Sequence, residues 1–366
     1  MRQFFESPRI AEVARGRNNN FNLLRFLAAF LVILHHAKPG NLLPIYWLTN
    51  GREDSGSTAV LIFFAISGFL VTQSFTRTNL AGFLSARALR IFPALWIAVP
   101  FTIIVSSFAS AVPWGRYLTH PQTIRYWVHN SFLWDLQYTL PGAFLHVPLA
   151  RSVNGSLWTL PAELRMYWVC AGLGLLGLYA ARPAFNALLA ALMVAGMIVR
   201  PETLPLVGTI NVAQWEFTFL IGAAFFLNRN EIRLNIPLAL ALLVASKYVI
   251  EDPYMGHLYI VPAMAYATLC LGLHPALFFR PFTRFGDYSY GLYIYAFPLQ
   301  QQMVFYHPQM NWLKRLALTF PIILGVAVLS WHFIEEPALR LKQRFRPKPL
   351  PPVPEATADF LVASRG

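Results

Sequence analysis

Three polar side chains in the first apolar segment of the sequence have the types and the spacing to do chemistry. Arg25 and His36 stand eleven positions apart. At about 100° per residue, this separation returns a helix to within ~20° of the same face, whereas His35 is rotated from that face by about 80°. Ionisable groups are costly to insert into an apolar span, so each of the three is a candidate functional residue.

The chemistry that an imidazole at position 36 offers is acyl transfer. A neutral His36 could take the proton from an attacking sugar hydroxyl and return it to a leaving thiolate. Alternatively, it could carry the acyl group itself. Arg25 could orient His36 through an intermediate group or bind an anionic part of the donor. The structural alternatives are a histidine bonded to a neighbouring carbonyl and an arginine that anchors the helix at the interface.

Two further sets of charged residues could serve the same chemistry. Glu163 follows Pro161 near the start of the fourth apolar segment, where a helix N-terminus stabilises an acid without any functional reason. Glu163 could also pair with Arg165, contact the acceptor, or set the tautomer of a histidine. Arg87 and Arg90 are three positions apart, so they project to one side of a helix and could bind phosphates. Anchoring on the cytoplasmic side is the alternative for this pair.

The elements that position these residues are transmembrane helices. The chain is 56% hydrophobic and only 12% charged, which is outside the usual range for a soluble protein. Apolar runs long enough to cross ~30 Å of hydrocarbon recur along it. We therefore predict an all-α, polytopic membrane protein with about ten transmembrane helices, at residues 20–38, 58–75, 91–112, 157–180, 184–200, 211–227, 234–250, 257–276, 287–305 and 313–334.

The basic residues outside these segments predict the orientation. With a cytoplasmic N-terminus, 18 Lys and Arg residues lie on the cytoplasmic side and 9 on the other, as the positive-inside rule requires. Both termini are then cytoplasmic. We divide the chain into a cytoplasmic N-terminal segment (1–19), a membrane domain (20–345) and a disordered cytoplasmic tail (346–366) whose prolines lack apolar periodicity.

The net charge of +13 also has its simplest explanation in the membrane. Cations in short loops beside apolar spans are attracted to anionic lipid headgroups, so we expect lipids and not nucleic acid as partners. Cys170 and Cys270 both fall within predicted spans and have no metal-ligand spacing, so we expect neither a disulfide nor a metal site.

Six motifs arrive in an order that resembles a known family. They are Arg25 with His36, FFAISGFLV, Arg87 with Arg90, NGSLWTLPAELRMYW, YSYGLYIYAFP and FIEEPALRLKQR. Together, over roughly residues 20–345, they resemble the acyltransferase 3 family of bacterial integral-membrane acyltransferases. The resemblance implies about ten transmembrane helices in the bacterial inner membrane. It also implies a cytoplasmic acyl-coenzyme A donor, acetyl-CoA in our prediction, and a glycan acceptor at or beyond the outer face.

The resemblance also implies roles for individual residues. His36 matches the family's essential histidine and Arg25 its partner. Arg87 and Arg90 match an arginine pair that is associated with the phosphates of coenzyme A. Glu163 falls on the acid of a motif that begins at a tryptophan. We therefore expect His36, Arg25 and Glu163 to be catalytic, and Arg87 and Arg90 to bind the donor.

The remaining expectations concern contacts with the substrate and departures from the family pattern. We expect Trp158, which begins that motif, and His35 to contact the substrate. Many relatives carry an acid where Leu61 stands here, so its role would be absent or moved to Glu53 or Asp54. The Ser67–Phe69 segment and the tyrosines of YSYGLYIYAFP are predicted to serve helix packing.

Several alternatives stay open at this point. Intramembrane Arg, His and Glu residues could instead form the relay of a secondary transporter or of a flippase for a glycan-related substrate. An acyl-binding sensor without catalysis is a third possibility. Direct transfer and an acyl-histidine intermediate are equally compatible with the sequence, and so are a monomer and a homo-oligomer.

Overall fold

The computed structural model describes residues 4–14, 18–37, 43–148, 152–198, 210–248, 253–280, 282 and 285–345. Within them every regular element is helical, so the predicted all-α class is confirmed. The tail predicted at 346–366 and part of the N-terminal segment 1–19 lie outside the described residues. The α-helices are α1 (Ile10–Val13), α2 (Phe21–Ala37), α3 (Pro44–Leu48), α4 (Ser55–Phe75), α5 (Leu80–Ser107), α6 (Trp114–Thr119), α7 (Pro121–Ser131), α8 (Leu160–Leu175), α9 (Arg182–Ile198), α10 (Ile210–Leu227), α11 (Ile236–Ala245), α12 (Pro253–Leu273), α13 (Ser289–Tyr306), α14 (Trp312–Ser330) and α15 (Glu336–Arg340).

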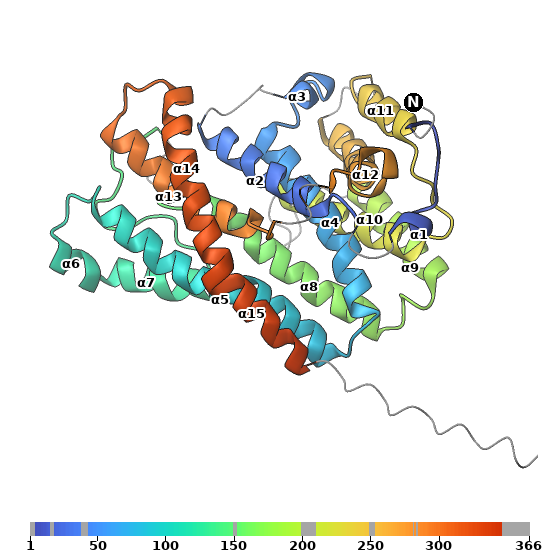
Figure 1. Ribbon diagram of the computed structural model, residues 1–366, viewed down its shortest axis with the longest axis horizontal. Helices are drawn as coiled ribbons and strands as arrows, with labels where there is room; N and C mark the ends of the chain where they lie inside the picture. The colour runs from blue at the N-terminus through green and yellow to red at the C-terminus, as the bar shows by residue number, and fades with distance from the viewer. Residues whose placement is uncertain are drawn as a thin grey trace, which may run out of the picture.

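Within the described residues, three stretches of helix are long and apolar enough to cross a membrane. They are Ser55–Phe75, Leu80–Ser107 and Trp312–Arg340, and the last combines α14, a π-helical turn at Trp331–Glu335 and α15 into one rod (Figure 1). Each of the ten predicted segments overlaps a helix. Several of the described apolar helices, such as Phe21–Ala37 and Ile236–Ala245, are only 10–17 residues long. The number of spans and the orientation of the termini therefore stay predictions.

Local sequence explains where the helices around the site begin. Asp54 caps α4 by accepting a hydrogen bond from the amide of Ser57 (2.7 Å), and Asn79 caps α5 through the amide of Gly82 (2.8 Å). Short polar side chains at these positions satisfy amides that have no partner within the helix. A 3-10 turn at Gly155–Thr159 leads directly into α8.

Helix α4 lies at the centre of the molecule, against α2, α10 and α12 (Figure 1). Its contact with α10 is unusually close: a Cβ atom added to Gly68 would lie 1.9 Å from the carbonyl oxygen of Phe219, and one added to Gly222 would lie 2.4 Å from that of Ala65. The packing role predicted for the Ser67–Phe69 segment is thus confirmed at Gly68.

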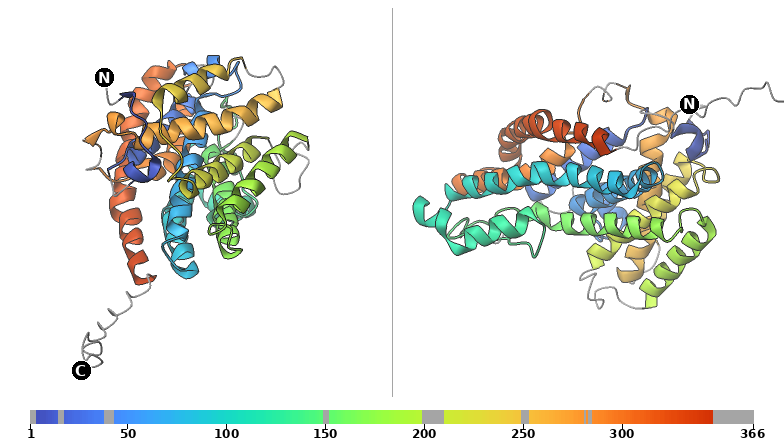
Figure 2. Two further views of the ribbon diagram at one scale, coloured as in Figure 1. Left: turned by 90° about the vertical axis from the view of Figure 1, so that its right-hand side faces the viewer. Right: turned by 90° about the horizontal axis from the view of Figure 1, so that it is seen from below.

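The remaining helices enclose this centre from two sides. Helix α13 packs against α2, α5 and α14, while α8 contacts α4 and α5. Seen from below, α7 and α8 lie beside the long helix α5 (Figure 2). One end of the bundle is therefore surrounded by the start of α2, the end of α4, the segment before α13 and the rod of α14 and α15.

Candidate functional site

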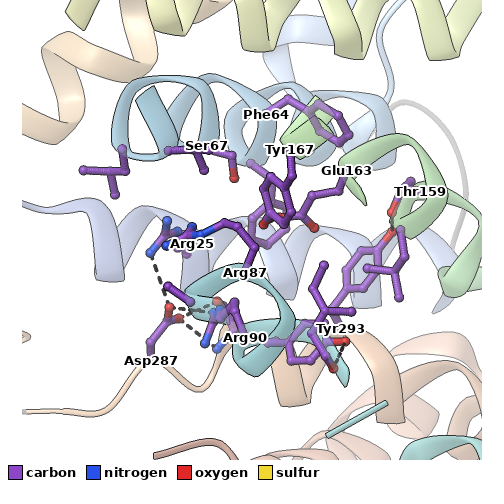
Figure 3. Close-up of a pocket in the computed structure, with 18 of the residues that line it drawn as sticks. Arg25, Phe64, Ser67, Arg87, Arg90, Thr159, Glu163, Tyr167, Asp287 and Tyr293 are labelled. Atoms are coloured by element: carbon purple, nitrogen blue, oxygen red, sulfur yellow. Dashed lines mark hydrogen bonds and ion pairs between the residues drawn. The ribbon is translucent and has the colours of Figure 1, made fainter. Parts of the chain in front are cut away.

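A buried carboxylate joins two arginines that are far apart in the sequence. Asp287, just before α13, accepts hydrogen bonds through Oδ2 from Nη1 of Arg25 (3.3 Å) and Nη2 of Arg90 (2.8 Å) (Figure 3). Its Oδ1 accepts from the hydroxyl of Ser289. Arg90 also reaches Glu335, with Nη1 3.4 Å from Oε2. The cluster therefore places two guanidinium groups against two carboxylates.

The charges in this cluster offset one another. Asp287 is only 9% exposed. The guanidinium groups of Arg90 and Arg25, together with hydrogen bonds from Ser289, stabilise its charged carboxylate. Arg90 thus has two carboxylate partners, and in the predicted binding of donor phosphates the phosphates would compete with them for its charge.

A second group of polar side chains faces the same interior from α5 and α8. The hydroxyl of Tyr167 donates a hydrogen bond to Oε1 of Glu163, one helical turn away. The guanidinium of Arg87 lies over the Tyr167 ring, 5.6 Å from its centroid. The Arg87 Nε atom is buried and has no hydrogen-bond partner among the described residues. Glu163 does not pair with Arg165. The Nη2 atom of Arg165 instead lies 2.5 Å from Oε1 of Glu216.

These two groups line a common cavity of about 270 Å³. Figure 3 shows Arg25, Arg87 and Arg90 converging on it from one side, with Glu163 and Tyr167 facing them. The walls between the charged groups are apolar. We call this space the arginine cavity; its polar lining consists of Arg25, Ser67, Arg87, Arg90, Thr159, Glu163, Tyr167, Asp287, Ser289, Tyr290, Tyr293 and Lys342.

The two histidines line a different cavity of about 210 Å³, which we call the histidine cavity. The rings of His35 and His36 meet edge to face, with centroids 5.3 Å apart, and His36 contacts the ring of Phe297 in the same way at 4.8 Å. Nδ1 of His35 lies 3.6 Å from Oδ2 of Asp54. Trp158, the predicted substrate contact, also lines this cavity.

The shared helical face of Arg25 and His36 therefore leads into two cavities. Arg25 lines the arginine cavity and pairs with Asp287, whereas His36 lines the histidine cavity. Eleven residues of α-helix separate the two Cα atoms by about 16 Å along the axis. An orienting action of Arg25 on His36 would thus have to pass through other groups.

Two residues border both cavities, Val60 of α4 and Tyr293 of α13. The Tyr293 hydroxyl lies 2.6 Å from Oγ1 of Thr159, and its ring packs on Phe63. Phe297, which touches His36, follows Tyr293 by one helical turn. The phenol of Tyr293 therefore lies in the wall between the arginine cavity and the histidine cavity.

Neither Asp287 nor the hydroxyl of Tyr293 was predicted from the sequence to belong to the site. Tyr293 was predicted to serve packing; it is buried as expected, yet its side chain also borders both cavities. The four-residue spacing of Tyr293 and Phe297 would have indicated a shared face. Asp287 offered no local signal, since its partners Arg25 and Arg90 come from other helices.

The two acids proposed to replace the one missing at Leu61 have different surroundings. Asp54 caps α4 and faces His35 in the histidine cavity. Glu53 is fully buried, with Nε2 of Gln214 donating to its Oε1 at 3.3 Å. Asp54 is therefore the acid that lies beside the histidines.

Other predicted features concern stability. Arg340 pairs with Glu336 (2.8 Å) at the end of the rod. Both cysteines are buried and unpaired. In the part of the chain that the structure describes, no group of three or more His, Cys, Asp or Glu side chains is arranged to hold a metal ion.

Comparisons with known proteins identify the family of the chain. The family model described as an acyltransferase domain, of the acyltransferase 3 type, matches residues 18–331. An O-acetyl transferase of Shigella phage Sf6 is 29% identical over 363 residues, which cover 91% of this chain and 98% of that protein. Nodulation protein 10 of Rhizobium leguminosarum bv. viciae is 27% identical over 366 residues, which cover 90% of this chain and 96% of that protein. No solved structure matches the chain significantly.

Proposed function

Because the chain belongs to the acyltransferase 3 family, whose domain model spans residues 18–331, we propose that it transfers an acetyl group from acetyl-coenzyme A to a glycan hydroxyl in the bacterial inner membrane. The acyl group is taken as acetyl because a relative that aligns over nearly its whole length is named an O-acetyl transferase. Membrane association follows from the family and from helices such as α4 and α5.

The observation that carries the proposal is the pair of cavities with Tyr293 and Val60 in their common wall. A two-substrate transfer needs two binding spaces that meet at the reacting atoms. In our proposal the thioester enters the arginine cavity from the cytoplasm and the acceptor occupies the histidine cavity. The carbonyl carbon of the thioester then lies beside Tyr293, within reach of His36.

His36 is proposed to act as the general base. Its imidazole takes the proton of the acceptor hydroxyl while that oxygen attacks the thioester carbonyl. Collapse of the tetrahedral intermediate breaks the carbon–sulfur bond, and the same proton returns to the leaving thiolate. Asp54, near Nδ1 of His35, would support the charge that develops on the histidine pair.

The lining of the histidine cavity supports a sugar as the acceptor. Trp158 and Trp215 meet edge to face with centroids 4.5 Å apart and present apolar surface to the cavity. Asp54, Asn211 and Ser156 supply hydrogen-bonding groups in the same lining. Apolar faces combined with a few placed polar groups suit a ring that carries hydroxyls.

A genetic experiment tests the proposal directly. Glycans from a deletion strain should lack an O-acetyl ester that the parent carries, and the wild-type gene should restore it. His36→Ala should not restore the ester, whereas His307→Ala, an exposed histidine, should. Normal esterification with well-expressed His36→Ala would exclude the proposed base.

Assays on the purified protein separate the alternatives. A transporter or flippase would release no thiol from acetyl-CoA. Rapid quenching of the reaction would reveal any acetylated His36.

A further inference from the structure

A third cavity adjoins the arginine cavity and is the largest of the three, at about 830 Å³. The start of α2, the end of α4, the segment before α13 and the rod of α14 and α15 surround it. We call it the vestibule. It shares six lining residues with the arginine cavity: Arg25, Leu70, Asp287, Trp331, Leu339 and Lys342. Anything bound in the vestibule could therefore extend into the arginine cavity.

The charged groups of the vestibule favour an anion. Its lining includes Arg77, Arg340 and Lys342 in addition to Arg25. Glu336 pairs with Arg340, and Asp287 pairs with Arg25. Arg77 is exposed and has no carboxylate partner within the described residues. Guanidinium and ammonium groups in excess over carboxylates are the usual ligands of phosphate oxygens.

The vestibule also offers aromatic surface. Phe279 and Phe285 are 50% and 54% exposed, and Phe282 packs against Phe285 with ring centroids 5.6 Å apart. Asn22 and Gln73 lie in the same lining. An aromatic face can stack on a nucleobase, and neighbouring amides can bond its edge or a ribose hydroxyl. Cations and aromatic rings in one cavity are typical of a nucleotide site.

From this combination we infer that the vestibule binds the nucleotide half of the thioester donor, an adenosine that carries a 3′-phosphate and a 5′-diphosphate. The inference rests on the proposed function, since it assumes a coenzyme A thioester. It assigns the phosphates to Arg77 and Lys342 in place of the expected Arg87 and Arg90. Arg90 is held by Asp287 and Glu335, and Arg87 lies deeper, over Tyr167. The pantetheine arm then runs past Trp331 toward Tyr293.

Trp331 has a fixed place on this route. A Cβ atom added to Gly286 would lie 2.2 Å from the indole Nε1 of Trp331, so the ring packs directly on the backbone before α13. Trp331 lines both the vestibule and the arginine cavity. In our inference the narrow arm of the donor passes this indole on its way from the vestibule into the arginine cavity.

Binding of adenosine 3′,5′-bisphosphate to the purified full-length protein in nanodiscs of zwitterionic lipid tests the inference. The double variant Arg77→Ala, Lys342→Ala should bind this nucleotide about tenfold more weakly for each cation removed. The matched control Arg116→Ala, Lys314→Ala removes two cations that do not line the vestibule and should bind like the wild type. The nucleotide should compete with acetyl-CoA. Arg77 is exposed, so Arg77→Ala alone provides a variant whose fold is unaffected.

The outcomes separate this inference from the proposed function. If the wild type releases no thiol from acetyl-CoA with any acceptor glycan, the proposed function fails. If it does, but the Arg77 and Lys342 variants bind the nucleotide as tightly as the wild type, the vestibule is not the nucleotide site. The same measurement in nanodiscs with anionic lipid tests whether the vestibule instead binds the phosphate of a lipid headgroup. Loss of nucleotide binding in these nanodiscs would identify a headgroup site and overturn the inference.

Discussion

The hydroxyl oxygen of Tyr293 lies 2.6 Å from Oγ1 of Thr159, in the wall between the arginine cavity and the histidine cavity. A phenol held in this way is oriented before any substrate arrives. Its proton can be directed at an oxygen that becomes negative during acyl transfer, and such preorganised donors contribute strongly to catalysis. Tyr293 is therefore the residue whose hydroxyl we expect to stabilise the tetrahedral intermediate.

The first prediction concerns this hydroxyl. Tyr293→Phe keeps the ring that packs on Phe63 but removes the donor, so kcat should fall by about 10²-fold while KM for acetyl-CoA changes little. Thr159→Val should have a smaller effect, because it only loosens the orientation. Initial rates of thiol release provide the measurement. Tyr248→Phe, an exposed position, is the control, and an equal loss in both variants would contradict the role.

The second prediction concerns the stability that Asp287 provides. Asp287→Asn removes a charge shared by Arg25 and Arg90, and breaking a buried ion pair on one side costs about 3–5 kcal/mol. The Asp135–Arg125 pair has side chains that are 60% and 58% exposed, so Asp135→Asn should cost under about 1 kcal/mol. Thermal inactivation in detergent compares the two variants. Equal midpoints would show that the Asp287 cluster contributes no stability.

The third prediction concerns the contact of α4 with α10. In Gly68→Ala the new methyl group would meet the backbone of Phe219, which no side-chain rotation can relieve. Separating the two helices should cost about 1–3 kcal/mol. Gly172→Ala is the matched control, because its methyl group would meet no atom within 4 Å and alanine favours the helix. A thermal midpoint for Gly68→Ala equal to that of Gly172→Ala would contradict the close contact.

The sequence predicted the helical class and several site residues for identifiable reasons. Apolar runs indicate helices whatever surrounds them, and the helical period placed Arg25 and His36 on one face. Periodicity along one helix says nothing about how many cavities that face borders. The structure assigns the two side chains to separate cavities because α4 and α13 close the space between them.

Contacts between distant segments were beyond what the sequence could specify. Asp287 reaches Arg25 and Arg90 only after α2, α5 and the segment before α13 have packed together. The pairing of Arg165 with Glu216 depends in the same way on α8 meeting α10. By contrast, the bond from Tyr167 to Glu163 spans four residues of one helix, so it could have been predicted from spacing alone.

The shared border at Val60 and Tyr293 has a consequence for the choice of acyl group. In the proposed transfer the acyl group lies at this border, where a two-carbon unit needs less room than a branched or extended chain, which would have to displace Val60 or Tyr293. Val60 carries the smaller side chain of the two and stands on α4, which packs closely against α10. On this proposal Val60 limits the size of the transferred group although it takes no part in the chemistry.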